Sequence, residues 1–443
     1  MDEYLNTVIE QIRCKAARPF IEEELRGHIE DQVADNIAAG MEQEEAVKCA
    51  VADMGDPVET GISLDRIHRP QISWAMLALV AVVTVIAMLI HITIGGNGVD
   101  GEFYLSRKAP VRYLLGLSIM FFVYWVDYTF IARFAKPIAF LMIIFSAYVM
   151  INGVSYNGYS YVRMAWMTFS IKHIMLLYIP VYACILYKYR GTGTKGILKS
   201  LFWMIIPTLF VFRIPALMTS MIMLISMLTL ITIAILKDWF IVPKRIAIAA
   251  IWSILIGLPA LLCGMFFNIL LYDYQKDRIK SIFATENVPY VTNCIRNIMS
   301  VSKMTGNSGE DIMSTLPGFN SDYILTYITS TYGLLALILA IATISVMLVG
   351  IFGIALRQRN QLGMMIAVGS GIVLLMNMVI NVLENIGRFP PTSTFFPFVS
   401  AGGCSLITCY ILIGIVLSVY RYKTIYPKHV CVNYPKIKIE LKL

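Results

Sequence analysis

The side chains best suited to chemistry lie between residues 272 and 322, in a long polar connection that separates two apolar runs. This connection ends at Asp322, directly before the second run. A carboxylate there can take a proton from a hydroxyl group, and cations beside it can stabilise a phosphate or diphosphate. The candidate cations are Arg278, Lys280, Arg296 and Lys303.

Each of these residues also has an ordinary structural explanation. Ser-Asp before an apolar run is a common helix N-cap, so Asp322 could simply begin a helix. The four bases could contact lipid headgroups. A connection this long is usually functional or disordered. Because cations alternate with apolar residues such as Ile279 and Ile282, we expect the segment to lie along a membrane surface and meet an anionic, lipid-linked group.

The composition excludes an ordinary soluble enzyme. Of the 443 residues, 58% are hydrophobic and only 14% are charged, against roughly 25% charged in soluble proteins. Residues 1–70 hold 16 of the 28 acidic residues but only 7 of the 36 Lys and Arg. A small acidic domain therefore precedes a large basic membrane domain.

The cysteines and histidines indicate no metal centre. The eight cysteines include no C-x-x-C pair and stand near no histidine cluster. We therefore predict neither a zinc site nor a disulfide framework. No cofactor is expected, although the sequence leaves a divalent cation open. Membrane lipids are expected partners, and nucleic acid is not.

Residues 1–69 are predicted to form an acidic cytoplasmic domain of three helices. Ile21, Leu25 and Ile29 recur every four residues, and this run ends at Gly40. A second helix ends at Gly55-Asp56-Pro57. Residues 12–32, I-R-C-K-A-A-R-P-F-I-E-E-E-L-R-G-H-I-E-D-Q, resemble the permease-prefix (HAAS-type) signalling domain that precedes bacterial membrane proteins. A helical cap with no partner is the alternative.

The rest of the chain predicts an all-α, polytopic membrane domain over residues 72–420, followed by a basic cytoplasmic tail at 421–443. A helix needs roughly 20 apolar residues to cross a bilayer. Ten runs approach this length: 72–95, 112–131, 137–153, 168–187, 198–212, 216–236, 246–271, 323–353, 363–385 and 402–420.

The loop charges predict the orientation, because cytoplasmic loops collect Lys and Arg. If the acidic domain is inside, the short inner loops carry more bases than the short outer loops. The inner bases are Arg133, Lys136, Lys188, Arg190, Lys195, Lys199, Lys237, Lys244, Arg245, Arg357 and Arg359. Both termini are therefore expected in the cytoplasm, and the long loop 272–322 on the outer face.

A few ionisable residues are expected at membrane depth, where such groups are costly and are usually paired or line a cavity. These residues are Asp127, Lys172, His173, Arg213 and Glu384.

Three stretches of the chain resemble the FtsW/RodA/SpoVE (SEDS) family of shape, elongation, division and sporulation proteins. Tyr274-Gln275-Lys276-Asp277-Arg278-Ile279 resembles the family's Y-Q-x-x-R-[IV]. Leu316-Pro317 followed by Ser321-Asp322-Tyr323-Ile324 resembles L-P-[ED]-x-x-T-D-F-[IV]. Residues 396–405, F-P-F-V-S-A-G-G-C-S, resemble L-P-F-[IV]-S-Y-G-G-S-S, and Asn381, Gly387, Pro390 and Thr392 fit the positions before it.

The resemblance implies a peptidoglycan glycosyltransferase of the bacterial cell membrane. Such an enzyme joins lipid II units on the outer face and works with a class B penicillin-binding transpeptidase in division or shape control. The family's essential aspartate falls on Asp322. Gln275 falls on the glutamine of the first motif, and Arg163 corresponds to an R-W arginine, although Met164 replaces the tryptophan. We expect both to join the four bases in binding substrate.

Two family motifs are missing, which leaves three hypotheses open. Residues 168–173 keep only the serine of Q-P-S-E-x-x-K, and Ala216 stands where Q-P-D-x-G-T has its aspartate. The first hypothesis is a divergent lipid II polymerase with Asp322 as base. The second is a non-catalytic scaffold or sensor that binds lipid-linked precursor or a transpeptidase. The third is a transporter of a lipid-linked substrate, although no internal repeat is evident.

Overall fold

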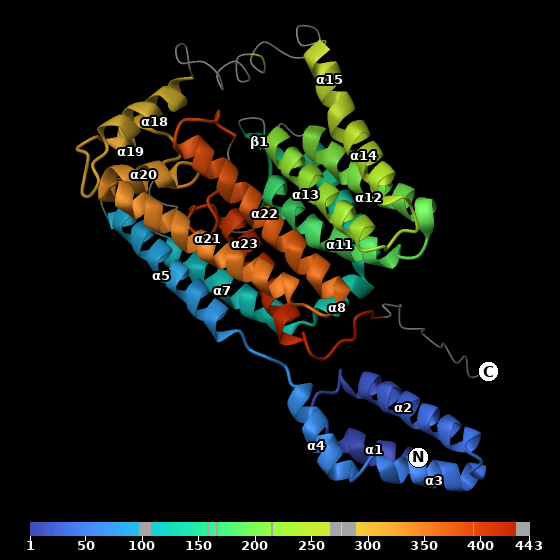
Figure 1. Cartoon of the computed structure of the whole chain (residues 1–443). Helices are drawn as coiled ribbons and strands as arrows, with labels where there is room; N and C mark the ends of the chain where they lie inside the picture. The colour runs from blue at the N-terminus through green and yellow to red at the C-terminus, as the bar shows by residue number, and fades with distance from the viewer. Residues whose placement is uncertain are drawn as a thin grey trace, which may run out of the picture.

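The computed structural model describes residues 1–96, 108–156, 159–164, 167–213, 216–265, 276, 289–392 and 394–430. It shows a large helical bundle and, beyond one end of it, a smaller unit of N-terminal helices (Figure 1). The segment after residue 67 leads from this unit into the first long helix of the bundle.

The N-terminal unit has four helices, so the prediction of three is wrong. They are α1 (Asp2–Gln11), α2 (Arg18–Ala38), α3 (Gln43–Asp53) and α4 (Pro57–Ile67). Gly55-Asp56-Pro57 ends one helix and also begins the next. The Asp56 carboxylate accepts a hydrogen bond from Glu59 N (3.2 Å), and proline suits the first turn of a helix.

The predicted all-α membrane architecture is confirmed. Within the described residues, nine helices are long and apolar enough to cross a membrane, and α7 is a shorter apolar helix. Every predicted apolar run contains a helix. The bundle consists of α5 (Trp74–Gly96), α7 (Ala109–Trp125), α8 (Tyr128–Arg133), α9 (Ala135–Asn152), α10 (Ile171–Ile174), η1 (Met175–Leu177), α11 (Tyr178–Lys188), α12 (Gly193–Arg213), α13 (Leu217–Leu236), α14 (Lys244–Trp252), η2 (Ser253–Gly257), α15 (Leu258–Met265), α21 (Leu334–Leu356), α22 (Gln361–Asn385) and α23 (Gly403–Arg421).

The core of the bundle forms around α22 and α23. Helix α22 packs against α11 and α21, and α23 packs against α7. The contact between α7 and α23 depends on Gly116, where an added Cβ would lie 2.2 Å from the Tyr410 ring. Small residues allow such close helix approach where lipid offers no hydrophobic driving force.

Three short helices cover the end of the bundle opposite the N-terminal unit (Figure 1). They are α18 (Tyr290–Val301), α19 (Ile312–Thr315) and α20 (Ile324–Tyr332). The run 323–353, predicted as one helix, is divided at Gly333, whose φ of 96° does not continue an α-helix. Consequently α20 stays at this end while α21 crosses the bundle.

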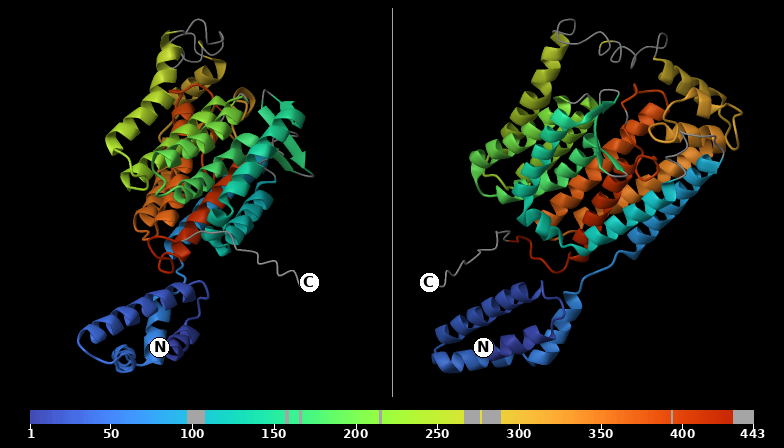
Figure 2. Two further views of the ribbon diagram at one scale, coloured as in Figure 1. Left: turned by 90° about the vertical axis from the view of Figure 1, so that its right-hand side faces the viewer. Right: turned by 180° about the vertical axis from the view of Figure 1, so that it is seen from behind.

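A small antiparallel sheet lies at the edge of the bundle (Figure 2). Its strands β1 (Val154–Tyr156), β2 (Tyr159–Met164) and β3 (Met167–Ser170) lead directly into α10. The helical prediction for 168–187 therefore begins about three residues too early.

The C-terminal strap, residues 421–430, links the bundle to the N-terminal unit. Gln71 N donates a hydrogen bond to Arg421 O (2.9 Å). The Phe20 ring meets the Tyr426 ring edge to face, with centroids 5.6 Å apart. The N-terminal unit and the end of α23 therefore lie at the same end of the bundle.

Candidate active site

Asp322 lies in the turn between α19 and α20, and the backbone of this turn is held by two other segments. The Asp322 carbonyl accepts hydrogen bonds from Asn381 Nδ2 (2.9 Å) and Asn385 Nδ2 (3.0 Å) of α22. The preceding carbonyl, Ser321 O, accepts one from Ser400 Oγ (2.7 Å). Helix α20 has Tyr323 as its N-cap and no side-chain cap, so the N-cap explanation of Asp322 is not supported.

The last turn of α22 supplies the side chains that fix this backbone. Residues 381, 384 and 385 are three and four positions apart, which places their side chains on neighbouring parts of one helix face. Asn385 Oδ1 also accepts hydrogen bonds from Thr326 N (3.0 Å) and Thr326 Oγ1 (2.9 Å). Asn381 Nδ2 donates a second bond to Thr394 O (3.1 Å). The turn, α22 and the loop before α23 therefore form one hydrogen-bonded unit.

Residues 394–401, which precede α23, are fixed from their other side by α5 and α7. Tyr113 Oη donates to Phe398 O (2.9 Å), and Arg112 Nη1 donates to Ala401 O (2.6 Å). Phe398 has a positive φ of 64°, uncommon for a side chain of this size. Such conformations persist only where the surroundings determine them.

Two charged side chains at membrane depth interact electrostatically with Asp322. Lys172, from the short helix α10, interacts electrostatically with Asp322 and with Glu384. Glu384 also interacts with Asp322. The three residues come from regions of the chain more than 60 positions apart, and together they form the charge cluster of this site.

The hydrogen bonds to Glu384 come from the loop that follows α22. Thr392 donates both its backbone N–H and its hydroxyl to Oε1, and Thr394 Oγ1 donates to Oε2 at 2.5 Å. The Glu384 side chain is only 1% exposed. The carboxylate is therefore buried with both oxygens occupied.

The predicted substrate-binding residues are only partly described. Arg296, on α18, donates from Nε to Gly387 O (3.0 Å), which fixes the turn after α22. Lys303 is exposed beyond the end of α18. Gln275, Arg278 and Lys280 lie outside the described residues, and so does the side chain of Arg163, whose backbone belongs to β2. Their roles in binding stay predictions.

Lys172 and Glu384 could be recognised in the sequence as ionisable residues at membrane depth, but not as neighbours of Asp322. Their position in apolar runs was the signal, because ionisable residues at membrane depth are usually paired or functional. The pairing itself was not visible in the sequence. Among the described residues, no group of three or more His, Cys, Asp or Glu side chains can hold a metal ion.

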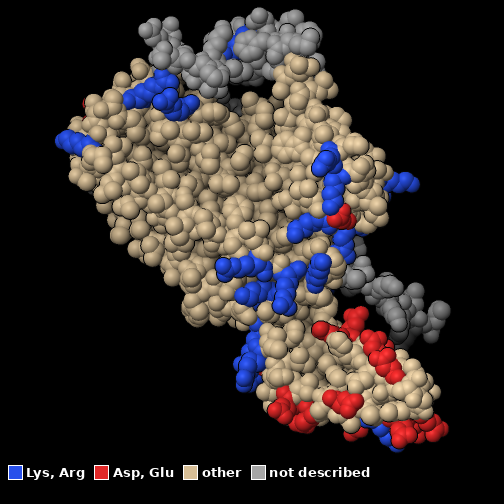
Figure 3. Space-filling model, in the orientation of Figure 1, with Lys and Arg blue, Asp and Glu red and all other residues tan. Residues whose placement is uncertain are grey.

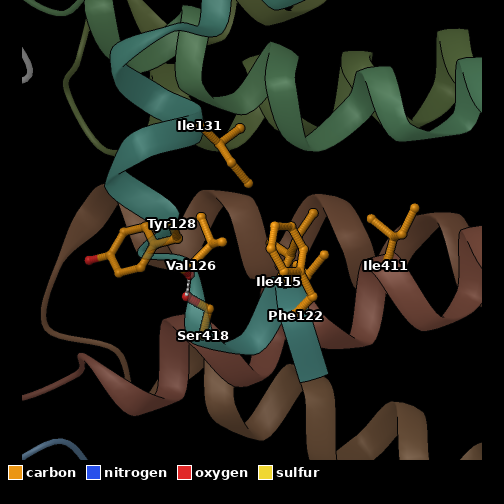
Figure 4. Close-up of a pocket in the computed structure, with 8 residues that line it drawn as sticks. Phe122, Val126, Tyr128, Ile131, Ile411, Ile415 and Ser418 are labelled. Carbon is orange, nitrogen blue, oxygen red and sulfur yellow. Dashed lines mark hydrogen bonds between the residues drawn. The ribbon is translucent and has the colours of Figure 1, made fainter. Parts of the chain in front are cut away.

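An apolar pocket lies elsewhere, between α7, α8 and α23 (Figure 4). It holds about 150 Å³ and is lined by Phe122, Val123, Val126, Tyr128, Ile131, Ile411, Ile415 and Ser418. Ser418 lies near the C-terminal end of α23, whereas the loop that contacts Asp322 precedes the N-terminal end of this helix. The pocket is therefore separate from the charge cluster.

Comparison with known proteins gives consistent results. The family model FtsW/RodA/SpoVE, described as "Cell cycle protein", matches residues 70–425. Peptidoglycan glycosyltransferase MrdB of Helicobacter pylori is 24% identical over 346 residues, which cover 74% of this chain and 86% of the relative. A probable peptidoglycan glycosyltransferase FtsW of the same species is 35% identical over 114 residues, 26% of this chain and 29% of the relative.

Solved structures show the same fold. One, titled "Structural coordination of polymerization and crosslinking by a peptidoglycan synthase complex", aligns with a TM-score of 0.65 at 17% identity, covering 79% of this chain and 98% of that chain. The rod shape determining protein RodA of Thermus thermophilus aligns with a TM-score of 0.57 at 17% identity, covering 80% and 97%. The N-terminal unit lies outside the residues that the family model matches.

Proposed function

The chain belongs to the FtsW/RodA/SpoVE family of cell cycle proteins, and we propose that it is a peptidoglycan glycosyltransferase that polymerises lipid II in the bacterial cell membrane. Relatives named as peptidoglycan glycosyltransferases support this activity. The observation that carries the proposal is the placement of Asp322. Its backbone is fixed by α22 through Asn381 and Asn385, and the cation Lys172 interacts with it electrostatically.

The proposed reaction uses Asp322 as the general base. The acceptor hydroxyl oxygen attacks the anomeric carbon of the donor sugar and gives its proton to Asp322. The bond from that carbon to the diphosphate oxygen breaks, and the diphosphate-lipid leaves with the electron pair. Cations stabilise the negative charge that develops on the leaving group. A direct displacement inverts the anomeric centre and needs no carboxylate nucleophile. Arg278 and Lys280 remain the proposed diphosphate contacts.

We place the site on the outer face and both termini in the cytoplasm. Lys and Arg gather at the end of the bundle beside the N-terminal helices, with a further group at the opposite end, and acidic residues lie on the N-terminal helices (Figure 3). The Arg421 guanidinium there lies 4.3 Å from the Trp125 ring centroid, and aromatic and cationic side chains are typical of a membrane interface. Since α18–α20 cover the opposite end, the positive-inside rule supports an outer location for Asp322.

A class B penicillin-binding transpeptidase is the proposed partner. The solved neighbour whose title names both polymerisation and crosslinking supports such an assembly.

We further propose that the N-terminal unit is a permease-prefix-like signalling domain, with contacts to the C-terminal strap as its route to the bundle.

A non-catalytic scaffold is the second candidate, favoured by the loss of the acidic motifs at 168–173 and at Ala216. Purified full-length protein, supplied with labelled lipid II with and without its transpeptidase, distinguishes the two candidates. The polymerase proposal expects glycan chains in at least one of these conditions. Absence of polymer in both, with lipid II still bound, contradicts the polymerase and favours the scaffold.

A further inference from the structure

Glu384 is the least expected charged residue of the bundle. It lies in the last turn of α22, where its side chain is 1% exposed. Removing a carboxylate from water costs several kcal/mol unless a counter-charge and hydrogen bonds replace the solvent. The structure supplies both. Thr392 and Thr394 donate to its oxygens, and Lys172 provides the opposite charge.

The threonine contacts fix the position of this carboxylate. Thr392 bonds Oε1, and Thr394 bonds Oε2. The backbone of Thr394 is itself bonded to Asn381, which holds Asp322. Glu384 and Asp322 are therefore attached to the same hydrogen-bonded unit, and Lys172 of α10 interacts electrostatically with both.

We propose that Glu384 is a positioning residue that shares the Lys172 ammonium with Asp322 and so sets how readily Asp322 accepts a proton. This inference rests on the proposed glycosyltransferase function. When Asp322 is ionised, Lys172 stabilises it. When Asp322 takes the proton of the acceptor hydroxyl, Glu384 remains as the counter-charge of Lys172. Proton transfer then leaves no cation unpaired in a low-dielectric site.

Two other cations among the described residues near the cluster already donate hydrogen bonds to backbone carbonyls. Arg296 of α18 donates to Gly387 O, and Arg112 of α7 donates to Ala401 O. His173 adjoins Lys172 and packs against the Phe395 ring, with centroids 5.3 Å apart. Among the described residues, we therefore assign the field at Asp322 to Lys172 and Glu384.

Removing the charge of Glu384 and removing that of Lys172 are expected to shift the pH dependence of polymerisation in opposite directions. Activity requires ionised Asp322, so the polymerisation rate falls at low pH as Asp322 becomes protonated. This fall is the acid limb of the pH–rate profile. Glu384→Gln removes a negative charge and favours the ionised form, which moves the acid limb to lower pH, by about one unit, and lowers the maximal rate about tenfold because the base is weaker. Lys172→Met removes the stabilising cation, so the acid limb moves to higher pH by a similar amount.

Two variants separate charge from structure. Glu384→Asp keeps the charge, so its acid limb stays closer to that of the wild type. Thr394→Val removes one hydrogen bond but no charge, and we expect its acid limb to stay within a few tenths of a unit. Shifts of the same sign in Glu384→Gln and Lys172→Met, or no shift in either, overturn the proposal.

A stability cycle provides a readout that does not depend on activity. In full-length protein in lipid nanodiscs, Lys172→Met leaves Glu384 without its counter-charge and lowers the unfolding temperature. Adding Glu384→Gln removes that charge, so the double variant is expected to unfold at a higher temperature than Lys172→Met alone. If the losses in unfolding temperature of the two single variants simply add in the double variant, the proposal that Glu384 shares the Lys172 ammonium is overturned. A wild type that shows this coupling but makes no polymer refutes the glycosyltransferase and leaves the charge arrangement standing.

Discussion

At the scale of single residues, amide side chains hold the proposed base. Asn385, itself buried, donates to Asp322 O and accepts from both Thr326 N and Thr326 Oγ1. Neutral amides give this backbone a fixed position without adding charge beside the carboxylate. The residues that position Asp322 are thus distinct from those that set the charge around it.

Replacing Asn385 with alanine tests this support. The variant leaves the buried Thr326 N without its side-chain acceptor and removes one of the two amide donors to Asp322 O. A buried unsatisfied polar group costs about 1–3 kcal/mol. We expect a lower unfolding temperature and a reduced polymerisation rate. Asn297→Ala, at an exposed position of α18, is the matched control and is expected to change neither quantity. Equal behaviour of the two variants would remove Asn385 from its assigned role.

These contacts could not be predicted from the sequence. Asp322 was identified from its motif and from its place before an apolar run. Its partners Asn381 and Asn385 are 59 and 63 positions away, and no local pattern links them to it. Lys172 is farther still, so the resemblance pointed to the base but not to the charges around it.

At the scale of helices, the number and order of the membrane elements were predictable because bilayer thickness sets the length of each apolar run. The break of this run at Gly333 was not predictable, since residues 323–353 are apolar almost throughout. A tertiary contact explains it. Gly306 N and Leu335 N bond across the junction to Tyr332 O and Met304 O, and a Cβ at Gly333 would lie 2.6 Å from Met304 O.

Gly333→Ala is expected to disrupt the junction between α20 and α21. The positive φ and the clash with Met304 O together cost on the order of 1–3 kcal/mol, so the unfolding temperature and the polymerisation rate should both fall. Gly353→Ala, on the same helix α21, meets nothing within 4 Å and serves as the control. If both glycine variants behave alike, the break is not a structural requirement.

At the scale of the whole molecule, the chain separates two kinds of surface at opposite ends. The N-terminal unit and the C-terminal strap lie at one end, and the turn that carries Asp322 lies at the other (Figure 1). In the proposed signalling role, a signal received by the N-terminal unit would have to cross the bundle to reach the charge cluster. Helix α23 spans this distance, from the loop that holds Asp322 to the C-terminal strap.

Labelling of single cysteines tests the proposed orientation. In a background without the eight native cysteines, Glu310→Cys places a thiol at an exposed position before α19, and Asp31→Cys places one on the surface of α2. A membrane-impermeant maleimide should label the first in intact spheroplasts and the second only after permeabilisation. The reverse pattern would put Asp322 on the cytoplasmic side and contradict the proposed site.

The proposed reaction depends most directly on the carboxylate of Asp322, and the initial rate of lipid II polymerisation measures the contribution of this group. A positioned general base typically contributes 10²–10⁴-fold, so Asp322→Ala and Asp322→Asn should lower the rate by about a hundredfold or more while lipid II binding is retained. Asp311→Ala removes an exposed carboxylate from the same outer connection and should keep the wild-type rate. A rate for Asp322→Ala equal to that of Asp311→Ala would contradict the account.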